Sequence, residues 1–260
     1  MRRLDRYLRL LYVGAILVKL HLTSYLSLIV NVIFWSILLI IPTSMFSPDF
    51  SISLKTFIPG LVAMSIASMG LWTGTEFLRW MVHDGLTDMF RENGLGVYHY
   101  IVSTLPTDVI LLGIIPLLLL GVISSWFFEI DYLWILTGDM LPLLMGVLSL
   151  MIVELFYGSL SGYLYTKTRL SSSWTGLLQI MVTIGTVIPS KAYPNPYLAF
   201  VNPASLSAEL LRASYGVSGI ESSHLVFITL PFIFFYTYLS KLFSKWADEL
   251  MAKYGVEYRF

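Results

Sequence analysis

Glu154 stands deep inside a long apolar stretch of the chain, and we expect it to be the one carboxylate within a membrane span. Burying an ionised carboxylate in hydrocarbon costs several kcal/mol unless the group is paired, protonated or hydrated. Glu154 must therefore face something polar. Two interpretations stay open, namely a group that lines a substrate path or subunit seam, and a protonated side chain that hydrogen bonds to a neighbouring helix.

A second group of charged residues lies in the polar stretch 83–104. Asp84, Asp88 and Glu92 follow one another at every fourth position, so on a helix they would form one acidic stripe that Gly94 could terminate. Paired carboxylates can bind a metal ion, but such stripes more commonly face solvent or a partner. We predict no metal ligands here and interpret the stripe as an element that docks onto another protein.

Motifs for catalysis and nucleotide binding are missing from the sequence. It contains neither the glycine-lysine pair of a phosphate-binding loop nor a His-Glu-x-x-His metal motif, and it has no cysteine. A six-span serine protease would pair Ser161 with His224, but the predicted spans place these two residues at opposite membrane faces. Gly158 and Gly162 have instead the spacing of a close helix-packing face. We therefore expect no enzymatic activity in this chain.

Six long apolar stretches must position these groups. Each approaches or exceeds the roughly 20 residues that a helix needs to cross the hydrocarbon core of a bilayer. Hydrophobic residues make up 57% of the chain and charged residues 12%, against about 25% charged in soluble domains. We predict an all-α membrane protein, a single domain over residues 1–260 with six transmembrane helices. The predicted spans are residues 22–46, 56–78, 107–128, 140–165, 170–190 and 222–243.

The distribution of basic residues predicts the orientation of the chain. If both termini are cytoplasmic, thirteen of the sixteen Lys and Arg residues lie inside, and only Lys55, Lys191 and Arg212 lie outside. Residues 1–20 form a predicted amphipathic helix in the headgroup plane, with arginines along one face. That helix could anchor on anionic lipid or also contact a cytoplasmic partner. The chain has no long basic run, so we expect no nucleic-acid partner.

The segment between the last two spans is broken by prolines. Pro194, Pro196 and Pro203 lie within ten residues and forbid one continuous helix. The sequence after Pro203 predicts a short helix with Glu209 and Arg212 on its polar side. We expect this segment to re-enter the membrane from the outer face.

Two motifs give the chain a family resemblance. Asn202-Pro203, Glu209 and Arg212 have the spacing of an Asn-Pro-(x)5-Glu-(x)2-Arg segment before the last span, and Arg91-Glu92-Asn93-Gly94 follows the second span. In both respects, and in its layout, the chain resembles the permease subunits of ATP-binding-cassette (ABC) transporters, specifically the second, exporter-type family.

The resemblance implies a permease in the cell membrane that pairs with a second permease copy. It also implies docking of a cytoplasmic ABC ATPase through the amphipathic helix and the residues Asp88, Arg91, Glu92 and Gly94. ATP and Mg would then be bound by the partner ATPase, and no cofactor by this chain. The alternative is an ATP-independent secondary transporter or channel that uses Glu154 as its proton or cation site. The transported substrate stays open.

Overall fold

The computed structural model describes residues 2–20, 22–23, 25–27, 29–30, 33–34, 37–38, 49–77, 79, 92–128, 138–168 and 171–254. Every element in these ranges is helical, as the sequence predicts. The α-helices are α1 (Arg2–Leu20), α3 (Phe50–Trp72), α6 (Val97–Asp108), α7 (Ile115–Phe128), α8 (Met140–Thr168), α9 (Ser171–Val187), α10 (Pro203–Ser214) and α11 (Ser222–Tyr254). Two π-helices, η1 (Thr73–Phe77) and η2 (Val109–Ile114), and two 3₁₀ turns, η4 (Ser190–Ala192) and η5 (Pro196–Val201), complete the set.

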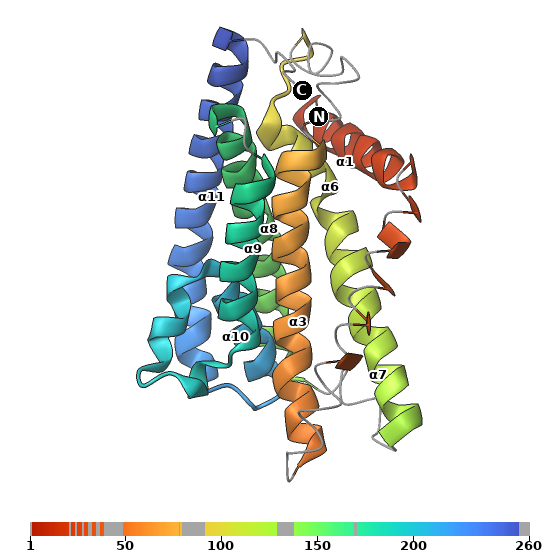
Figure 1. Ribbon diagram of the computed structural model, residues 1–260, viewed down its shortest axis with the longest axis vertical. Helices are drawn as coiled ribbons and strands as arrows, with labels where there is room; N and C mark the ends of the chain where they lie inside the picture. Colours follow the sequence, from red (N-terminus) through yellow and green to blue (C-terminus); the bar gives the residue numbers. More distant parts are fainter. Residues whose placement is uncertain are drawn as a thin grey trace.

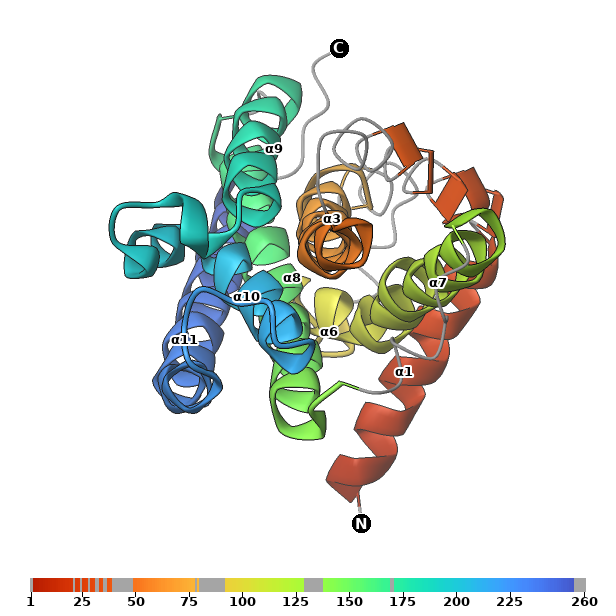
Figure 2. The ribbon, with the colours of Figure 1, turned by 90° about the horizontal axis from the view of Figure 1, so that it is seen from below.

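Within the described residues, four helices are long and apolar enough to cross a membrane. They cover Ser51–Thr75, Val97–Ile123, Met140–Thr168 and Ser222–Lys253, and Trp174–Val187 is a shorter apolar helix. The long helices run along the same axis, and α1 and the C-terminal end of α11 lie at one end of the bundle (Figure 1). Viewed along that axis, α3 and α8 lie centrally, between α6 and α7 on one side and α9 and α11 on the other (Figure 2). Most of the predicted span 22–46 lies outside the described residues.

The third predicted span begins earlier than expected. We predicted its start at residue 107, but the helix is continuous from Val97 through α6, η2 and α7. The residues that look like a polar loop belong to the bundle, and Ser103 and Thr104 are buried. Their hydroxyls donate to the carbonyls of Tyr100 and Ile101 in the preceding turn, which satisfies them without water.

Two other predicted boundaries also need correction. The second span begins at Phe50 rather than at residue 56, because Asp49 accepts a hydrogen bond from the Ile52 amide and caps the helix. The last helix continues past the predicted end at residue 243 to Tyr254. Its extension reaches α6, where Asp248 accepts a hydrogen bond from the first helical amide, that of Val97, at 3.1 Å. The C-terminal helix thereby fixes the point at which α6 begins.

Helices α3 and α8 cross through glycines. A Cβ added to Gly70 would lie 2.5 Å from the carbonyl oxygen of Glu154, and one added to Gly158 would lie 3.2 Å from the carbonyl oxygen of Gly70. Gly74 faces Gly158 and Ser161 equally closely. The predicted close-packing face is confirmed at Gly158, and Gly70 and Gly74 form the opposing side of the contact.

Helix α1 is confirmed as a helix and lies across the end of the bundle instead of along it (Figures 1 and 2). Leu10 is buried, whereas Leu8 and Tyr12 are exposed. Gly14 packs so closely on α6 that an added Cβ would collide with the carbonyl of Ser103. The helix is thus held by protein contacts on α6 as well as by its amphipathic character.

Candidate functional site

The first of two polar sites is a hydrogen-bond network built around α10. Asn202 caps this helix, because its Oδ1 accepts a hydrogen bond from the Ala204 amide at 3.0 Å. The same oxygen accepts from the hydroxyl of Tyr157 in α8 at 2.9 Å, and Asn202 Nδ2 donates to the carbonyl of Met181 in α9 at 2.6 Å. Pro203 follows at the first helical position, where its missing N–H is not needed. One side chain therefore starts α10 and ties it to two helices.

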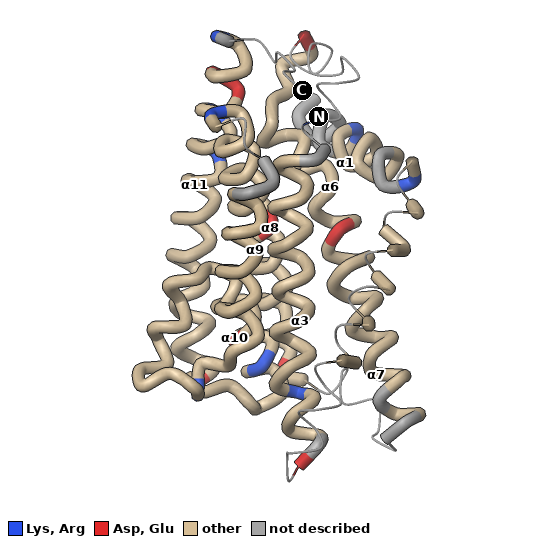
Figure 3. The backbone as a smooth tube through the Cα atoms, viewed as in Figure 1, with Lys and Arg blue, Asp and Glu red and all other residues tan. Residues whose placement is uncertain are grey.

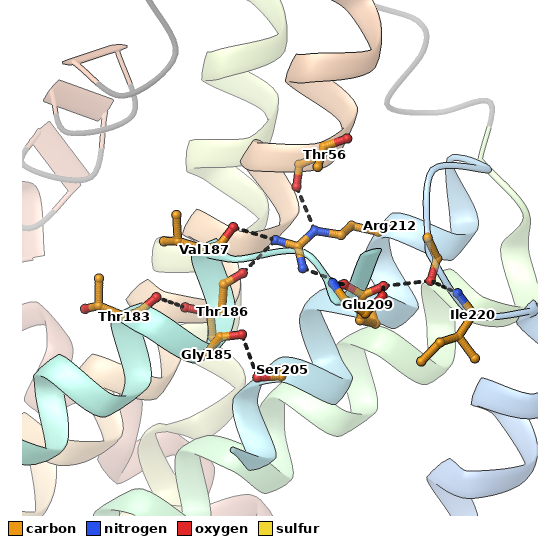
Figure 4. A network of polar contacts seen from close by, with 11 residues as sticks. Thr56, Thr183, Gly185, Thr186, Val187, Ser205, Glu209, Arg212 and Ile220 are labelled. Atoms are coloured by element: carbon orange, nitrogen blue, oxygen red, sulfur yellow. Dashed lines mark hydrogen bonds and ion pairs between the residues drawn. The ribbon is translucent and has the colours of Figure 1, made fainter. Parts of the chain in front are cut away.

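Arg212 is the centre of this network (Figure 4). Its Nε donates to the carbonyl of Thr56 in α3 at 2.7 Å, and its Nη2 donates to the carbonyl of Thr186 at 2.6 Å and that of Val187 at 3.3 Å. Thr186 and Val187 end α9, so the guanidinium caps carbonyls that the helix itself leaves unpaired. Its Nη1 donates to Glu209 Oε1 at 2.7 Å.

Glu209 completes the network on the other side of Arg212. Its Oε1 accepts from the Ser190 amide at 2.9 Å, and its Oε2 accepts from the hydroxyls of Ser190 and Ser218, each at 2.7 Å. Burial alone would raise the pKa of Glu209. The charge of Arg212 and these hydrogen bonds outweigh burial and hold the pKa of this carboxyl below its usual value.

We expected Glu209 and Arg212 on the polar side of α10, and the structure places them on one side of this helix, where they form an ion pair. All twelve residues of α10 are buried, so the helix has no polar side that faces solvent. The two charges are neutralised inside the protein, where they join α3, α9, α10 and the loop before α11 into one unit. This arrangement can hold the end of the bundle at α10 in a fixed geometry.

The second polar site lies inside the bundle, where acidic positions appear away from both ends (Figure 3). Glu154 of α8 is fully buried, and the polar group that faces it is Asp108 of α6. Asp108 is also fully buried, and its Oδ1 accepts a hydrogen bond from the Tyr25 hydroxyl at 2.5 Å. We call Asp108, Glu154 and Tyr25 the acid pair and its tyrosine. This arrangement can hold a proton between two carboxyl groups.

Asp108 corrects the expectation that Glu154 is the one carboxylate within a span. Its sequence neighbours Pro106 and Thr107 are typical of a loop, so the hydropathy pattern placed Asp108 at the border of a span. A signal was nevertheless present. Asp108 directly precedes an uninterrupted apolar run over residues 109–123, and a carboxylate on the same helix as such a run requires a partner.

The predicted docking residues are only partly described. Asp88 and Arg91 lie outside the described residues. Glu92 is exposed in the short turn before α6, and Gly94 adopts the left-handed conformation with φ of 65°, which suits a residue that terminates a helix. Gly96 then packs against Asp248, so the segment that carries Glu92 joins α6 where the C-terminal helix touches it.

No group of three or more His, Asp or Glu side chains that could hold a metal ion occurs among the described residues. Comparison of the chain with protein-family models, with curated proteins and with solved structures gives no match.

Proposed function

We propose that this chain is the membrane-spanning subunit of an ATP-driven exporter, in which it forms the translocation pathway and docks a separate cytoplasmic ABC ATPase. In this proposal the chain pairs with a second permease copy in the cell membrane and binds no cofactor itself. Six spans, cytoplasmic termini and a re-entrant α10 belong to the same proposal.

The observation that carries the proposal is the position of the four residues of the outer motif. Asn202, Pro203, Glu209 and Arg212 all lie on α10 or cap it, and each side chain with a polar group is fully engaged with α3, α8, α9 or the adjoining loops. A spacing that could have arisen by chance in the sequence thus forms one coherent structural unit. The transverse α1 at the opposite end supports the same layout (Figure 1).

The contacts at that opposite end suggest how force from an ATPase would reach the spans. The turn with Glu92 continues directly into α6, and α6 is held by Asp248 of α11 and by Gly14 of α1. A push on this turn would therefore act on three helices together. Closure of the ATPase dimer would then favour one of two bundle conformations that bind substrate differently.

Affinity purification of the tagged chain from its native membranes, with identification of co-purifying proteins by mass spectrometry, tests this function. We expect a stoichiometric ATPase with phosphate-binding loops. Charge reversal at Arg91 and Glu92 (R91E with E92R) should weaken that co-purification, whereas K191E at the other end of the bundle should not. A permease that purifies alone, in equal yield with and without these changes, would refute the docking role.

A second function is favoured by the acid pair. Secondary transporters use buried carboxyl groups as proton or cation sites, and this chain carries two such groups in contact, Asp108 and Glu154. The purified protein can also be reconstituted into vesicles to separate the two functions. Substrate transport that is driven by a proton gradient and needs no ATP would establish the gradient-driven transporter in place of the exporter.

A further inference from the structure

The carboxyl groups of Asp108 and Glu154 meet in the interior of the bundle, where both side chains are fully buried. They come from different helices, α6 and α8, and lie within hydrogen-bonding reach of each other. Gly70 of α3 packs directly against the backbone of Glu154. A Cβ added to Gly70 would have no room there. Both carboxyl groups are thus enclosed by packed helices.

Their oxygen atoms are unequally satisfied. Asp108 Oδ1 accepts a hydrogen bond from the Tyr25 hydroxyl at 2.5 Å. Asp108 Oδ2 and both oxygens of Glu154 have no hydrogen-bond donor among the described residues. Thr104 lies beside Asp108, but its hydroxyl donates to the carbonyl of Ile101. Among the described residues, the carboxyl groups of Asp108 and Glu154 therefore face each other, and the Tyr100 hydroxyl lies near Asp108.

The surroundings supply no described positive charge. Among the described residues, the other titratable side chains that interact with the pair are Tyr25, which donates to Asp108, and Tyr100, and both are neutral hydroxyls. Two ionised carboxylates about 4 Å apart repel each other by roughly 4 kcal/mol at an effective dielectric constant of 20, and burial adds a further cost for each charge. A hydrogen bond between two carboxyl groups also requires that one of them donates.

We propose that Asp108 and Glu154 form a proton-binding site, in which one proton is shared between Asp108 Oδ2 and the Glu154 carboxyl group while Tyr25 donates to Asp108 Oδ1. The bound proton gives the pair a single negative charge, and the Tyr25 hydroxyl stabilises that charge. This site connects Tyr25, α6 and α8. It holds for an ATP-driven and for a gradient-driven transporter alike, so it does not depend on the function proposed above.

Release of the proton would drive α6 and α8 apart. The π-helix η2 begins directly after Asp108, and π-helical segments occur often at functional sites because they adjust locally. A change of charge at Asp108 would therefore act on the part of the third span that is able to rearrange. The proton thereby links chemistry in the bundle interior to the geometry of this span.

Infrared spectroscopy of the purified protein at neutral pH tests the proposal, because a protonated carboxyl group has a carbonyl stretch that ionised carboxylates lack. We expect this band in the wild type, a shift of its frequency in the single variants E154Q and D108N, and its loss in the double variant that carries both changes, because a lone buried carboxyl group stays protonated. E249Q, which changes an exposed carboxylate of α11, should leave the band unchanged, and Y25F should shift its frequency without removing it. A wild-type spectrum without the band at neutral pH would overturn the proposal.

Chemical labelling provides a readout that requires no variant to insert correctly. Dicyclohexylcarbodiimide reacts with protonated carboxyl groups in apolar surroundings and leaves an adduct that peptide mass spectrometry locates. We expect labelling of Asp108 or Glu154 in wild-type membranes at neutral pH, with a decrease as the pH rises. Labelling confined to exposed carboxyl groups such as Glu249 would contradict a shared proton.

Discussion

Arg212 lies three residues after Glu209 in α10, and its Nη1 donates to Glu209 Oε1 at 2.7 Å with both side chains fully buried. The pair has no solvent to compensate either charge, so each residue depends on the other. The remaining guanidinium nitrogens bind carbonyls of α3 and α9. The ion pair therefore fixes the packing of α3, α9 and α10 at one end of the bundle.

Replacement of Arg212 by methionine should strongly destabilise the protein. The side chain keeps a similar length, but Glu209 is left as an uncompensated buried charge, which costs about 3–5 kcal/mol. Thermal unfolding in detergent measures this loss. The matched control is K245M, because Lys245 and Glu249 form an exposed pair at 3.6 Å that should contribute little. The double variant R212M with E209Q should recover part of the stability, and no recovery would argue against direct coupling of the two residues.

The lowered pKa of Glu209 predicts acid sensitivity. Because the folded-state pKa lies below that of the unfolded chain, the carboxylate contributes stability above about pH 4.5, and this contribution is lost as the pH falls through the folded-state value. E209Q should be less stable than the wild type at pH 7, and the difference should shrink as the pH falls toward 4. The measurement is the unfolding temperature of both proteins across this range. A constant difference would show that the charge of Glu209 does not contribute.

The crossing of α3 and α8 predicts that Gly70→Ala is destabilising. The new Cβ would lie 2.5 Å from a backbone oxygen of Glu154, so the helices must separate, at a cost of about 1–3 kcal/mol. Gly176→Ala in α9 is the matched control, since no atom lies within 4 Å of its added Cβ. That change should be neutral or stabilise the helix by about 0.5–1 kcal/mol. Equal unfolding temperatures for the two variants would show that α3 tolerates a shift at Gly70.

The contact between α1 and α6 predicts that Gly14→Val releases the N-terminal helix. The added side chain would collide with the backbone of Ser103, whereas Ala15→Val adds a similar volume at an exposed position of the same helix. We expect faster amide hydrogen exchange over residues 8–16 in G14V than in A15V. Identical exchange in both variants would mean that lipid, and not α6, holds α1 in place.

Much of the fold follows from patterns that a sequence displays directly. Apolar length predicts the long helices, the prolines predict the interruption before α10, and the spacing of Gly158 and Gly162 predicts the close packing that is found at Gly158. Pairings between distant residues leave no such pattern. Asp108 and Glu154 are separated by an entire predicted span and a loop, and neither residue indicates the other.

Hydrogen bonds from a side chain to backbone atoms are even harder to predict from the sequence. Arg212 binds the carbonyls of Thr56, Thr186 and Val187, which any residue type would supply. The buried start of α6 escaped prediction for a related reason. Ser103 and Thr104 are polar residues, but their hydroxyls donate to carbonyls of their own helix. A hydropathy scale does not include such hydrogen bonds.

The capping of α6 by Asp248 has a consequence for the order in which the chain is made. Asn202 binds Tyr157 and Met181, and both of these residues precede it in the sequence. Helix α10 can therefore be held by these contacts as soon as it is synthesised. The start of α6 is different, because its amide at Val97 has to wait for a carboxylate near the end of the last helix. During biogenesis the end of the bundle at α10 can therefore close first, and the end at which α6 begins is completed last.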